Sequence, residues 1–487
     1  MATIPFVQFS SLILYYIGLS NGQANLSRPK KPPQDQLRSV SSNVVFTDVQ
    51  EERKERTALD ISPFIHRHVA ISTKEPFHGE VYDAFAWHIR RVSRKYPELN
   101  ITVDIYEQEA VGDFTAWMQD LGMVTHPVKA AKDLRDDISR TDLFGDGRMI
   151  DLVIPASAET DVDEHSDYLW EAYQQRPADR RFELASIMHH GHNTEHWGHL
   201  SKWSRLRLFR YFFISEHVAR KARSLLQSWA DKKNTRDACF EYIRTDVFVP
   251  ILDLSSIIIP KERDPPRGLS RVAIQGNFDQ YMRDYEGTFR DLVQSFKADS
   301  TAWGYLPLRS DDAAASYQSD PRSAIPPFEL HLLGGRGKLN IPNELKNVVK
   351  VHFNLESRKY WAVLQSMHVI VPAFSRGDEY YTCIASSSCH SAMQCNVPLL
   401  VTRRLRESYT YLEDSVTIVR PQAISEIQAI KVLRTGVMPE VDSPTLENDI
   451  RRMMVGGWRR STSQFDAFKQ KIWDKNDELV TRVLCGE

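Results

Sequence analysis

The sequence predicts an α/β protein with two doubly wound, Rossmann-like sheets that face a cleft. Short apolar segments alternate with amphipathic helical segments from about residue 65 to residue 425. This alternation is typical of parallel sheets covered by helices on both faces. The pattern is interrupted once, at 260–270 (PKERDPPRGLS), where prolines and charges predict a linker. A chain of 487 residues also exceeds what one ordinary core fills, which favours two domains.

The first expected domain covers residues 63–262. Its predicted helix is the segment GEVYDAFAWHIRRVSRKY (79–96), which has helical spacing of apolar residues. Its expected strands are short apolar runs, namely HVAIST (68–73), NITVDIYEQ (100–108), MIDLVIPA (149–156), FELASIMHH (182–190), LFRYFFIS (208–215) and VFVPILDLSSIII (247–259).

The second expected domain covers residues 270–460 and repeats the same alternation. A helix is expected through TFRDLVQSF. The last segment of the chain, residues 461–487, is predicted to form one terminal amphipathic helix. The expected strand-bearing segments are RVAIQG (271–276), FELHLLGGRG (328–337), VVKVHF (348–353), YWAVLQSMHVIVPAF (360–374), VPLLVT (397–402) and VTIVRP (416–421).

The N-terminal region has the composition of a targeting segment. Residues 1–24 contain the apolar run IPFVQFSSLILYYIGL and predict a signal peptide or a signal anchor. Polar residues 25–62 predict a stalk or tether. N-x-S/T sequons at Asn25 and Asn100 predict glycosylation. We therefore expect the secretory pathway, secretion or membrane association through the N-terminus, and a cytoplasmic protein if residues 4–19 are no signal.

The charge balance and the cysteines exclude some classes of protein. A formal net charge of -2 gives no general field for nucleic acid, so no nucleic-acid partner is expected. The five cysteines are few, odd in number and without a C-x-x-C pair, which is a poor disulfide framework and a poor zinc motif.

Four segments of the second half carry a recognisable pattern, namely VAIQGNFDQYMRDYEGTF (272–289), FELHLLGGRG (328–337), VVKVHFNLESRKYWAVLQSMHVIVPAF (348–374) and YYTCIASSSCHSAMQCNVPLLV (380–401). They resemble the nucleotide-sugar domain of GT-B-fold glycosyltransferases, the glycosyl transferases group 1 pattern of eukaryotic, fungal-type relatives. In that family a glycine turn follows each of the first strands, and a helix with the pattern EAmA.G.Pvv closes the donor site. Here that helix reads SAMQCNVPLL (391–400).

The resemblance implies a set of donor-binding residues and a terminal helix that crosses back to the first domain. The two glutamates of the retaining branch fall on Cys383 and Ser391, which leaves Glu379 as the nearest upstream acid. The implied donor-binding residues are Asn277, Arg283, Gly335, Arg336, Glu379, Ser386, Ser387 and Ser388.

Physical chemistry supports the same segments independently. A serine run that opens a helix offers N-caps, hydroxyl donors and the positive end of the helix dipole to a diphosphate. The alternatives are a simple helix cap at Ser386–Ser388, an ordinary turn at Gly334–Gly337 and a helix-surface position for Arg283.

The stretch IMHHGHNTEHWGH (187–199) contains H-x-x-E-H at His192, Glu195 and His196. A zinc protease needs both histidines on one helix, whereas Gly191, Asn193 and Thr194 predict a turn at His192. We instead expect His189 and His190 at the carboxyl end of a central strand, as catalytic residues that orient or deprotonate an acceptor hydroxyl. The alternative is a structural histidine bonded to a loop carbonyl.

Two weaker motifs complete the candidates. TDVDEHSD (160–167) holds a D-x-D at Asp161 and Asp163, a pattern that binds a donor metal in GT-A enzymes, but no metal is expected here. FHGE (77–80) resembles the acceptor-side glycine turn, so Gly79 and Glu80 are candidate acceptor-binding residues, with a plain helix start as the alternative.

The sequence thus predicts a glycosyltransferase that moves a hexosyl or pentosyl group to an acceptor hydroxyl. Its partners would be a nucleotide-sugar co-substrate and a glycan, lipid or small-metabolite acceptor, without a further cofactor. The alternatives are a metal-dependent transferase or hydrolase that uses the His189–His199 cluster, and an inactive GT-B-like binding protein.

Overall fold

The computed structural model describes residues 66–74, 78–108, 114–120, 122, 128–140, 149–232, 238–252, 254, 268–308, 317–375, 377 and 379–487. The predicted signal or anchor, the predicted stalk, the Asn25 sequon and most of the predicted linker lie outside the described residues. The contacts between residues group Ser62–Glu487 into one compact unit, and this unit contains both sheets.

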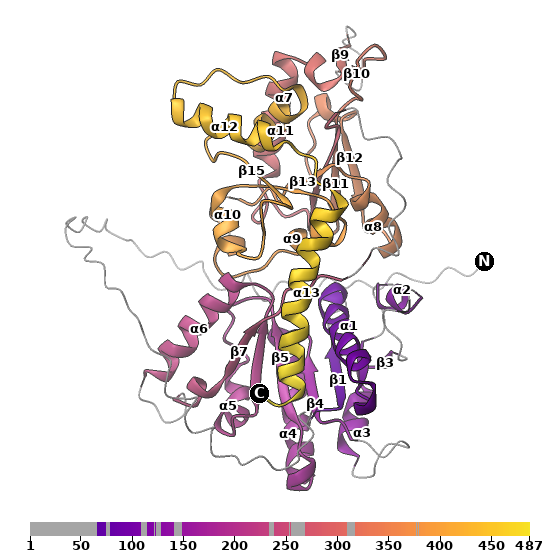
Figure 1. Cartoon of the computed structure of the whole chain (residues 1–487), viewed down its shortest axis with the longest axis vertical. Coiled ribbons are helices and arrows are strands. Elements are labelled where there is room, and N and C mark those ends of the chain that lie inside the picture. Colours follow the sequence, from indigo (N-terminus) through magenta and orange to yellow (C-terminus); the bar gives the residue numbers. More distant parts are fainter. Residues whose placement is uncertain are drawn as a thin grey trace, which may run out of the picture. The chain divides into compact units, whose positions relative to one another are not determined.

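Within the described residues, the first sheet has seven parallel strands in the order β3-β2-β1-β4-β5-β6-β7 (Figure 1). Strands β2 and β3 follow β1 on one side of the sheet, and strands β4 to β7 follow one another on the other side of β1. In chain order the strands are β1 (His68–Thr73), β2 (Thr102–Glu107), β3 (Lys129–Ala130), β4 (Leu152–Pro155), β5 (Glu183–Met188), β6 (Phe209–Phe213) and β7 (Arg244–Val247).

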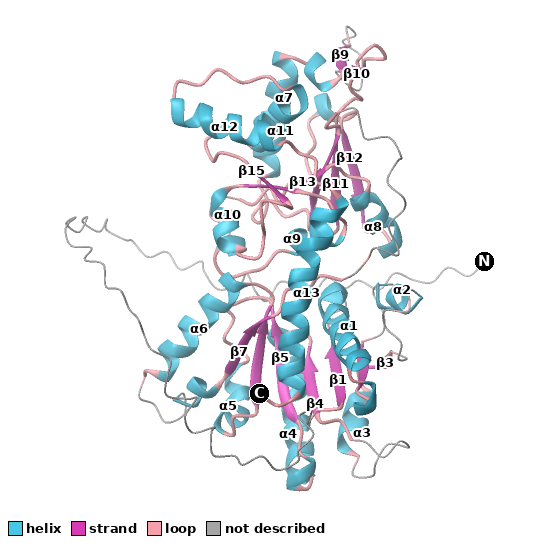
Figure 2. Ribbon diagram, viewed as in Figure 1, coloured by secondary structure: helices cyan, strands magenta, loops and turns pink. Residues whose placement is uncertain are grey.

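Helices cover this sheet, as Figure 2 shows. Strands β1, β4 and β6 are buried along their whole length, which explains why they read as continuous apolar runs in the sequence. The helices are α1 (Gly79–Lys95), α2 (Phe114–Asp120), α3 (Asp133–Ser139), α4 (Ala158–Gln175), α5 (Trp197–Arg205) and α6 (Glu216–Ala230).

A second sheet holds six described strands, all parallel, in the order β12-β11-β8-β13-β14-β15. They are β8 (Arg271–Gln275), β11 (Glu329–Gly334), β12 (Val349–Phe353), β13 (Val369–Ile370), β14 (Leu399–Val401) and β15 (Thr417–Val419). The antiparallel hairpin of β9 (Tyr305–Pro307) and β10 (Tyr317–Ser319) stands apart from it.

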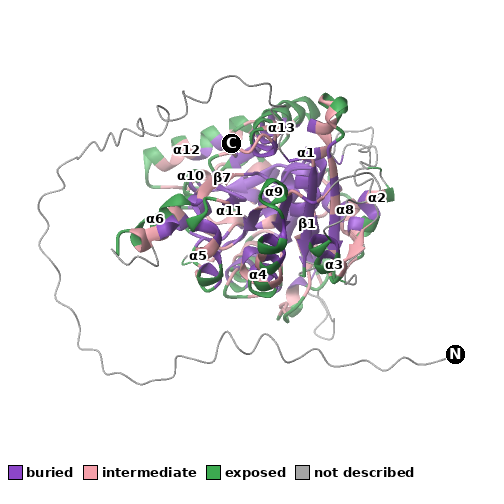
Figure 3. Ribbon diagram, turned by 90° about the horizontal axis from the view of Figure 1, so that it is seen from below, coloured by how far each residue is buried: buried purple, intermediate pink, exposed green. Residues whose placement is uncertain are grey.

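The helices of the second half are α7 (Tyr285–Ala298), α8 (Ser357–Gln365), α9 (Ser387–Gln394), α10 (Arg403–Ser408), α11 (Glu426–Thr435) and α12 (Pro444–Gly456). Short 3-10 helices lie at η2 (Pro97–Leu99), η3 (Ala178–Arg180), η4 (Ala238–Tyr242), η6 (Thr301–Trp303), η7 (Asn343–Leu345) and η8 (Glu379–Tyr381). Figure 3 shows that the sheets are largely buried and that exposed residues gather on the helices around them.

The two sheets share one topology, and the prediction of two doubly wound α/β units is confirmed. In each sheet the strand order reverses beside its first strand, between β1 and β4 and between β8 and β13. Ligands of such sheets bind outside the carboxyl ends of the strands at this switch point. The expected strand at 247–259 is wrong over its described part, because β7 ends at Val247 and residues 248–252 form no strand.

The terminal helix α13 (Thr462–Leu484) crosses from the second sheet to the first, as predicted (Figure 1). Near its start, Lys469 Nζ donates a hydrogen bond to the Gln394 carbonyl at 3.5 Å, on α9. Further along, Trp473 Nε1 donates to the Ile251 carbonyl at 2.8 Å, and Asp477 accepts a bond from Arg91 on α1. The helix therefore packs against both halves of the chain.

None of the helices that the structure describes is long and apolar enough to span a membrane. The cysteines Cys239, Cys383, Cys389 and Cys395 are buried and, like Cys485, form no disulfide. The sequon residue Asn100 is exposed and has a left-handed backbone (φ 49°) directly after η2.

Candidate active site

The carboxyl end of β5 contacts the loop that leads into α9, so the switch-point regions of the two sheets lie next to each other. The Gly191 N–H donates to the Cys383 carbonyl at 2.7 Å, and His190 and Ile384 form an antiparallel bridge. On α6, His217 Nε2 donates to the same Ile384 at its carbonyl, at 2.8 Å. The predicted catalytic histidines and the predicted donor-binding serines are therefore brought together from positions about two hundred residues apart in the chain.

The three serines open α9, as the sequence predicts. Ser386 is the N-cap, and its hydroxyl accepts the Ser388 N–H at 3.3 Å. Ser388 is fully buried and donates to the Gln275 carbonyl at 2.8 Å, which ties α9 to the end of β8. Ser387 is only half-buried, and its hydroxyl accepts from Gln275 Nε2 at 3.3 Å. Of the three hydroxyls, that of Ser387 is the most accessible to a ligand.

Arg283 lies beneath this helix end and not on a helix surface, so the surface position considered for it is wrong. The residue precedes α7, and its side chain is only 3 % exposed. Its guanidinium donates to the Pro372 carbonyl and, at 3.0 Å, to Ser388 Oγ. Phe374 and Tyr380 lie beside it as cation–π partners. None of the carboxylates that the structure describes forms an ion pair with Arg283.

The glycine turns after β8 and β11 are packed against each other. A Cβ on Gly334 would lie 1.9 Å from the Gly276 carbonyl oxygen, and one on Gly337 would lie 2.2 Å from that of Phe278. A Cβ on Gly335 would lie 2.0 Å from the Asn354 side chain. These glycines therefore permit close loop packing, and the exposed side chains that the loops present include those of Asn277, Arg336 and Lys338.

On the first sheet, His189 is held firmly at the end of β5. Its ring is 3 % exposed, stacks on the ring of His78 at 4.1 Å and donates from Nε2 to the Ala156 carbonyl at 3.1 Å. Burial lowers the pKa of both His78 and His189, which favours the neutral form of each ring. One Glu159 oxygen accepts the N–H groups of His189 and His190 at 2.8 and 2.7 Å. His190 is half-buried and thus more accessible than His189.

Glu80 lies in the first turn of α1, two residues after His78. Burial raises the pKa of its carboxyl from 4.5 to about 7. The pKa of the Tyr360 phenol on α8 is raised, first by burial and then by the negative charge of Glu80. Glu80 is therefore a carboxyl group with a pKa near neutrality that lies close to the second half of the chain. Gly79 is buried, and a Cβ there would lie 2.8 Å from the Phe114 ring, so packing alone favours glycine at this position.

The H-x-x-E-H residues do not converge, which agrees with the turn expected at His192. Helix α5 begins only at Trp197, so His192 lies in a turn and is exposed. His196 is fully buried, and its Nε2 lies 2.7 Å from the Tyr211 hydroxyl.

The D-x-D segment lies inside α4, where residues two apart point to different faces. Asp161 is buried and accepts the N–H groups of Lys74 and Ser157, each at 2.9 Å. Asp163 instead lies 3.6 Å from His199 on α5. The two carboxylates therefore do not form a metal pair.

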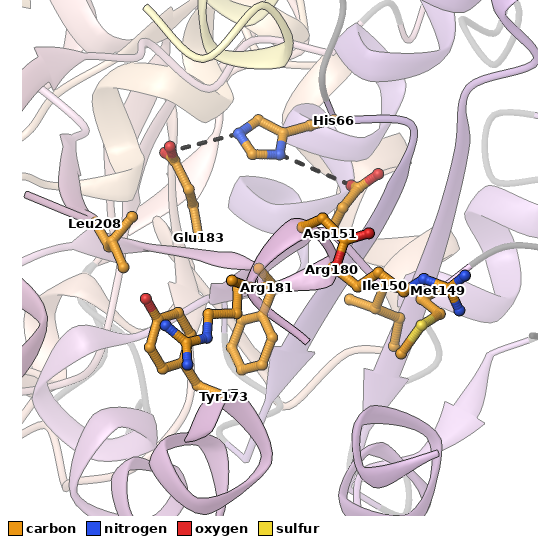
Figure 4. A pocket seen from close by; sticks show the side chains of 12 residues that line it. His66, Met149, Ile150, Asp151, Tyr173, Arg180, Arg181, Glu183 and Leu208 are labelled. Carbon is orange, nitrogen blue, oxygen red and sulfur yellow. Dashed lines mark ion pairs between the residues drawn. The ribbon is translucent and has the colours of Figure 1, made fainter. Parts of the chain in front are cut away.

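A cavity of about 620 Å³ lies at the opposite, amino-terminal edge of the first sheet (Figure 4). His66 lies between two carboxylates there, 3.6 Å from Glu183 and 3.9 Å from Asp151. Because ligands of doubly wound sheets bind at the carboxyl edge, this cavity is separate from the candidate active site.

Three residues of the candidate site are not among those predicted from the sequence. Glu159 could have been suspected because it begins a helix directly after a predicted strand, and His78 stands within the quoted FHGE segment. Tyr360 carries no motif and is found only because α8 packs near the start of α1.

No family model matches the sequence, and no curated protein matches it. Solved structures are similar only at low identity. An α-glucosyltransferase (AGT) in complex with UDP is 10% identical, with a TM-score of 0.46 over 83% of this chain and 99% of that chain. The sucrose-phosphate synthase from Thermosynechococcus elongatus is 12% identical, with a TM-score of 0.43 over 86% and 100%. The lipopolysaccharide outer core galactosyltransferase WaaB is 13% identical, with a TM-score of 0.41 over 84% and 97%. Similarity this low establishes neither a family nor an activity for this chain.

Proposed function

We propose that the chain is a glycosyltransferase that moves a hexosyl or pentosyl group from a nucleotide-sugar donor to an acceptor hydroxyl. The observation that carries the proposal is the buried Arg283 under the N-terminus of α9. A buried charge without a carboxylate partner among the described residues is costly unless an anion compensates it. The helix dipole adds positive potential at the same place, and a diphosphate supplies the matching charge.

The donor would lie over the second sheet's switch point. Ser387, Asn277 and Arg336 would contact its diphosphate and sugar, with Arg283 and Ser388 behind them. Gly335 permits the close loop packing, and Ser386 caps the helix. As the bond from the anomeric carbon to the diphosphate oxygen breaks, negative charge grows on the leaving group, and preorganised donors stabilise that charge.

The acceptor would enter from the first sheet's switch point. Glu80 has a pKa near neutrality and would take the proton of the acceptor hydroxyl while the acceptor oxygen bonds to the anomeric carbon. His190 would orient that hydroxyl. His189 would position the strand end rather than meet substrate, because its ring is buried between His78 and Ala156.

The test is nucleoside-diphosphate binding, measured by calorimetry across uridine, guanosine, adenosine and thymidine diphosphates. We expect saturable binding of at least one of them. Ser387→Ala and Arg336→Ala should each weaken it by roughly 10- to 100-fold, since a hydrogen bond to a charged group is worth about 1.5–3 kcal/mol.

Arg451→Ala on α12 is the matched control, since this exposed arginine pairs with Glu447. Unchanged affinity in both site variants would contradict the donor site. Tight binding without donor hydrolysis or transfer would favour an inactive binding protein.

Entry into the secretory pathway, a membrane association through residues 1–24 and glycosylation at Asn25 and Asn100 are further proposals that rest on the sequence. Exposure of Asn100 is compatible with glycosylation there. A lower mass after glycosidase treatment of protein from a eukaryotic host would support the glycosylation, and an unchanged mass would contradict it.

A further inference from the structure

Three side chains capable of binding a metal converge where the two sheets meet. His192, Glu379 and Cys383 each offer one ligand atom, and these atoms all lie within 4.8 Å of one another. His192 follows β5 of the first sheet, whereas Glu379 and Cys383 belong to the segment before α9 of the second. Their distance in sequence means that only the tertiary structure forms this cluster.

The backbone fixes the three positions before any metal binds. The Cys383 N–H donates to the Glu379 carbonyl at 2.8 Å, so the two residues stand one helical turn apart and share a face. His192 is placed by its neighbours, because the Gly191 N–H donates to the Cys383 carbonyl at 2.7 Å. A Cβ on Gly191 would lie 2.5 Å from the Val218 carbonyl oxygen, so glycine is needed for this approach.

The donor atoms select the class of metal. An imidazole nitrogen, a thiolate sulfur and a carboxylate oxygen suit Zn²⁺, whereas Mg²⁺ and Ca²⁺ prefer oxygen ligands alone. Thr382 Oγ1 lies 3.6 Å from Cys383 Sγ and can donate a hydrogen bond to it, an outer contact of the kind that supports a metal-bound thiolate. His192 and Glu379 are exposed, so the ion can enter from solvent.

We propose that His192, Glu379 and Cys383 form a Zn²⁺ site that ties the loop after β5 to the loop before α9. With three protein ligands, a tetrahedral zinc keeps one position for water or another ligand. The bound ion would hold together the two loops that carry His190 and Ser386–Ser388. Of the H-x-x-E-H motif, only His192 belongs to this site. His196 is not available as a ligand, because its Nε2 is hydrogen-bonded to the Tyr211 hydroxyl.

The test measures metal binding in the absence of nucleotide, so its outcome is independent of the proposed transferase activity. Zinc content after dialysis against Zn²⁺, and the melting temperature with Zn²⁺ or Mg²⁺, are compared for the wild-type chain, His192→Ala, Glu379→Gln and Cys383→Ser. His199→Ala is the matched control, because this exposed histidine of the same stretch lies next to Asp163 instead.

We expect about one zinc per wild-type chain and His199→Ala chain, with a higher melting temperature in Zn²⁺ than in Mg²⁺. Each ligand variant should bind zinc more than about tenfold more weakly, since even outer-shell changes cost roughly 10- to 100-fold. Replacement by Co²⁺ should give a thiolate-to-cobalt charge-transfer band that Cys383→Ser lacks.

Absence of saturable zinc binding by the wild-type chain would overturn the proposal. Full zinc retention by both His192→Ala and Cys383→Ser would also overturn it, because the ion would then lie elsewhere. His192 is exposed, so His192→Ala should keep the native circular dichroism spectrum and remains decisive if Cys383→Ser does not fold.

Discussion

At the residue scale, the environment of a side chain decides its role more than its type does. Arg283 and Arg336 were both predicted to bind the donor, but the first is buried under α9 and the second is exposed on a turn. Removing Arg283 would leave the Pro372 carbonyl and Ser388 with one partner fewer. Arg283→Ala should therefore lower stability as well as affinity, contrary to the behaviour of a surface arginine. Ser387 and Arg336 are the cleaner probes of binding.

Glu80 gives a residue-scale prediction for catalysis. Glu80→Gln keeps the shape of the side chain but cannot accept a proton, so we expect transfer to slow by about 10²–10⁴-fold. Because the carboxyl must be ionised, the wild-type rate should rise as pH increases through about 7. Nucleoside-diphosphate affinity should not change. A transfer rate with the same rising limb in Glu80→Gln would contradict the role, and Glu98→Gln, at an exposed position in η2, is the control.

The same substitution should change stability with a defined sign. The folded protein holds the Glu80 proton more tightly than the unfolded chain, so stability is lost as pH rises from about 4.5 to about 7. Glu80→Gln lacks this loss and should become more stable than the wild-type chain over that interval. The difference is at most about 3.4 kcal/mol, since the pKa rises from 4.5 to about 7 and each tenfold change in ionisation is worth about 1.36 kcal/mol. Urea unfolding at pH 4, 6 and 8 would measure it.

At the element scale, the candidate site is made of strand ends, glycine turns and helix starts. The turns after β8 and β11 lie so close together that side chains are excluded between them. Helix α9 begins directly beside the first of these turns, through the Ser388 bond to Gln275. The geometry of the turns therefore determines where the N-terminus of α9 lies.

Gly334→Ala tests this packing. The added methyl would overlap the Gly276 carbonyl oxygen, so the two turns must separate. We expect a loss of about 1–3 kcal/mol in the free energy of unfolding and weaker nucleoside-diphosphate binding. Gly456→Ala at the end of α12 is the control, because a Cβ there would meet no atom within 4 Å. Denaturant unfolding and calorimetry measure both effects, and equal behaviour of the two variants would refute the packing argument.

At the scale of the whole described unit, the two sheets act together because later segments return to earlier ones. The segment before α9 pairs with the end of β5, and α13 packs on both halves. Trp473 shows this clearly, since its ring contacts Trp87 of α1 edge-on at 5.3 Å and its Nε1 bonds to Ile251. We therefore expect residues 66–487 to unfold as one cooperative unit.

Trp473→Ala tests the role of α13. Truncation of a buried tryptophan typically costs about 3–5 kcal/mol, and the cost should appear in a single transition that includes both sheets. Gln470→Ala, on the exposed side of the same helix, should change stability by less than about 0.5 kcal/mol. Denaturation followed by circular dichroism and by tryptophan fluorescence checks the prediction. Two separate transitions in the wild-type chain would contradict it.

The sequence by itself determined the two doubly wound sheets, most of their strands, the serine-capped helix α9 and the terminal helix. These features follow from local patterns, since buried parallel strands read as apolar runs and helices as amphipathic stretches. The sequence alone also indicated that H-x-x-E-H is no protease site, because its turn residues are local.

Only the tertiary structure decided which predicted residues meet and which are buried. The contact between β5 and the segment before α9 joins residues far apart in the chain, and no local pattern encodes such pairing. Burial also raised the pKa of Glu80. The packing of the loop before α7 placed Arg283 beneath α9, and the position of the D-x-D segment inside α4 separated Asp161 from Asp163. The cluster of His192, Glu379 and Cys383 arises for the same reason, because its three ligands come from loops of different sheets.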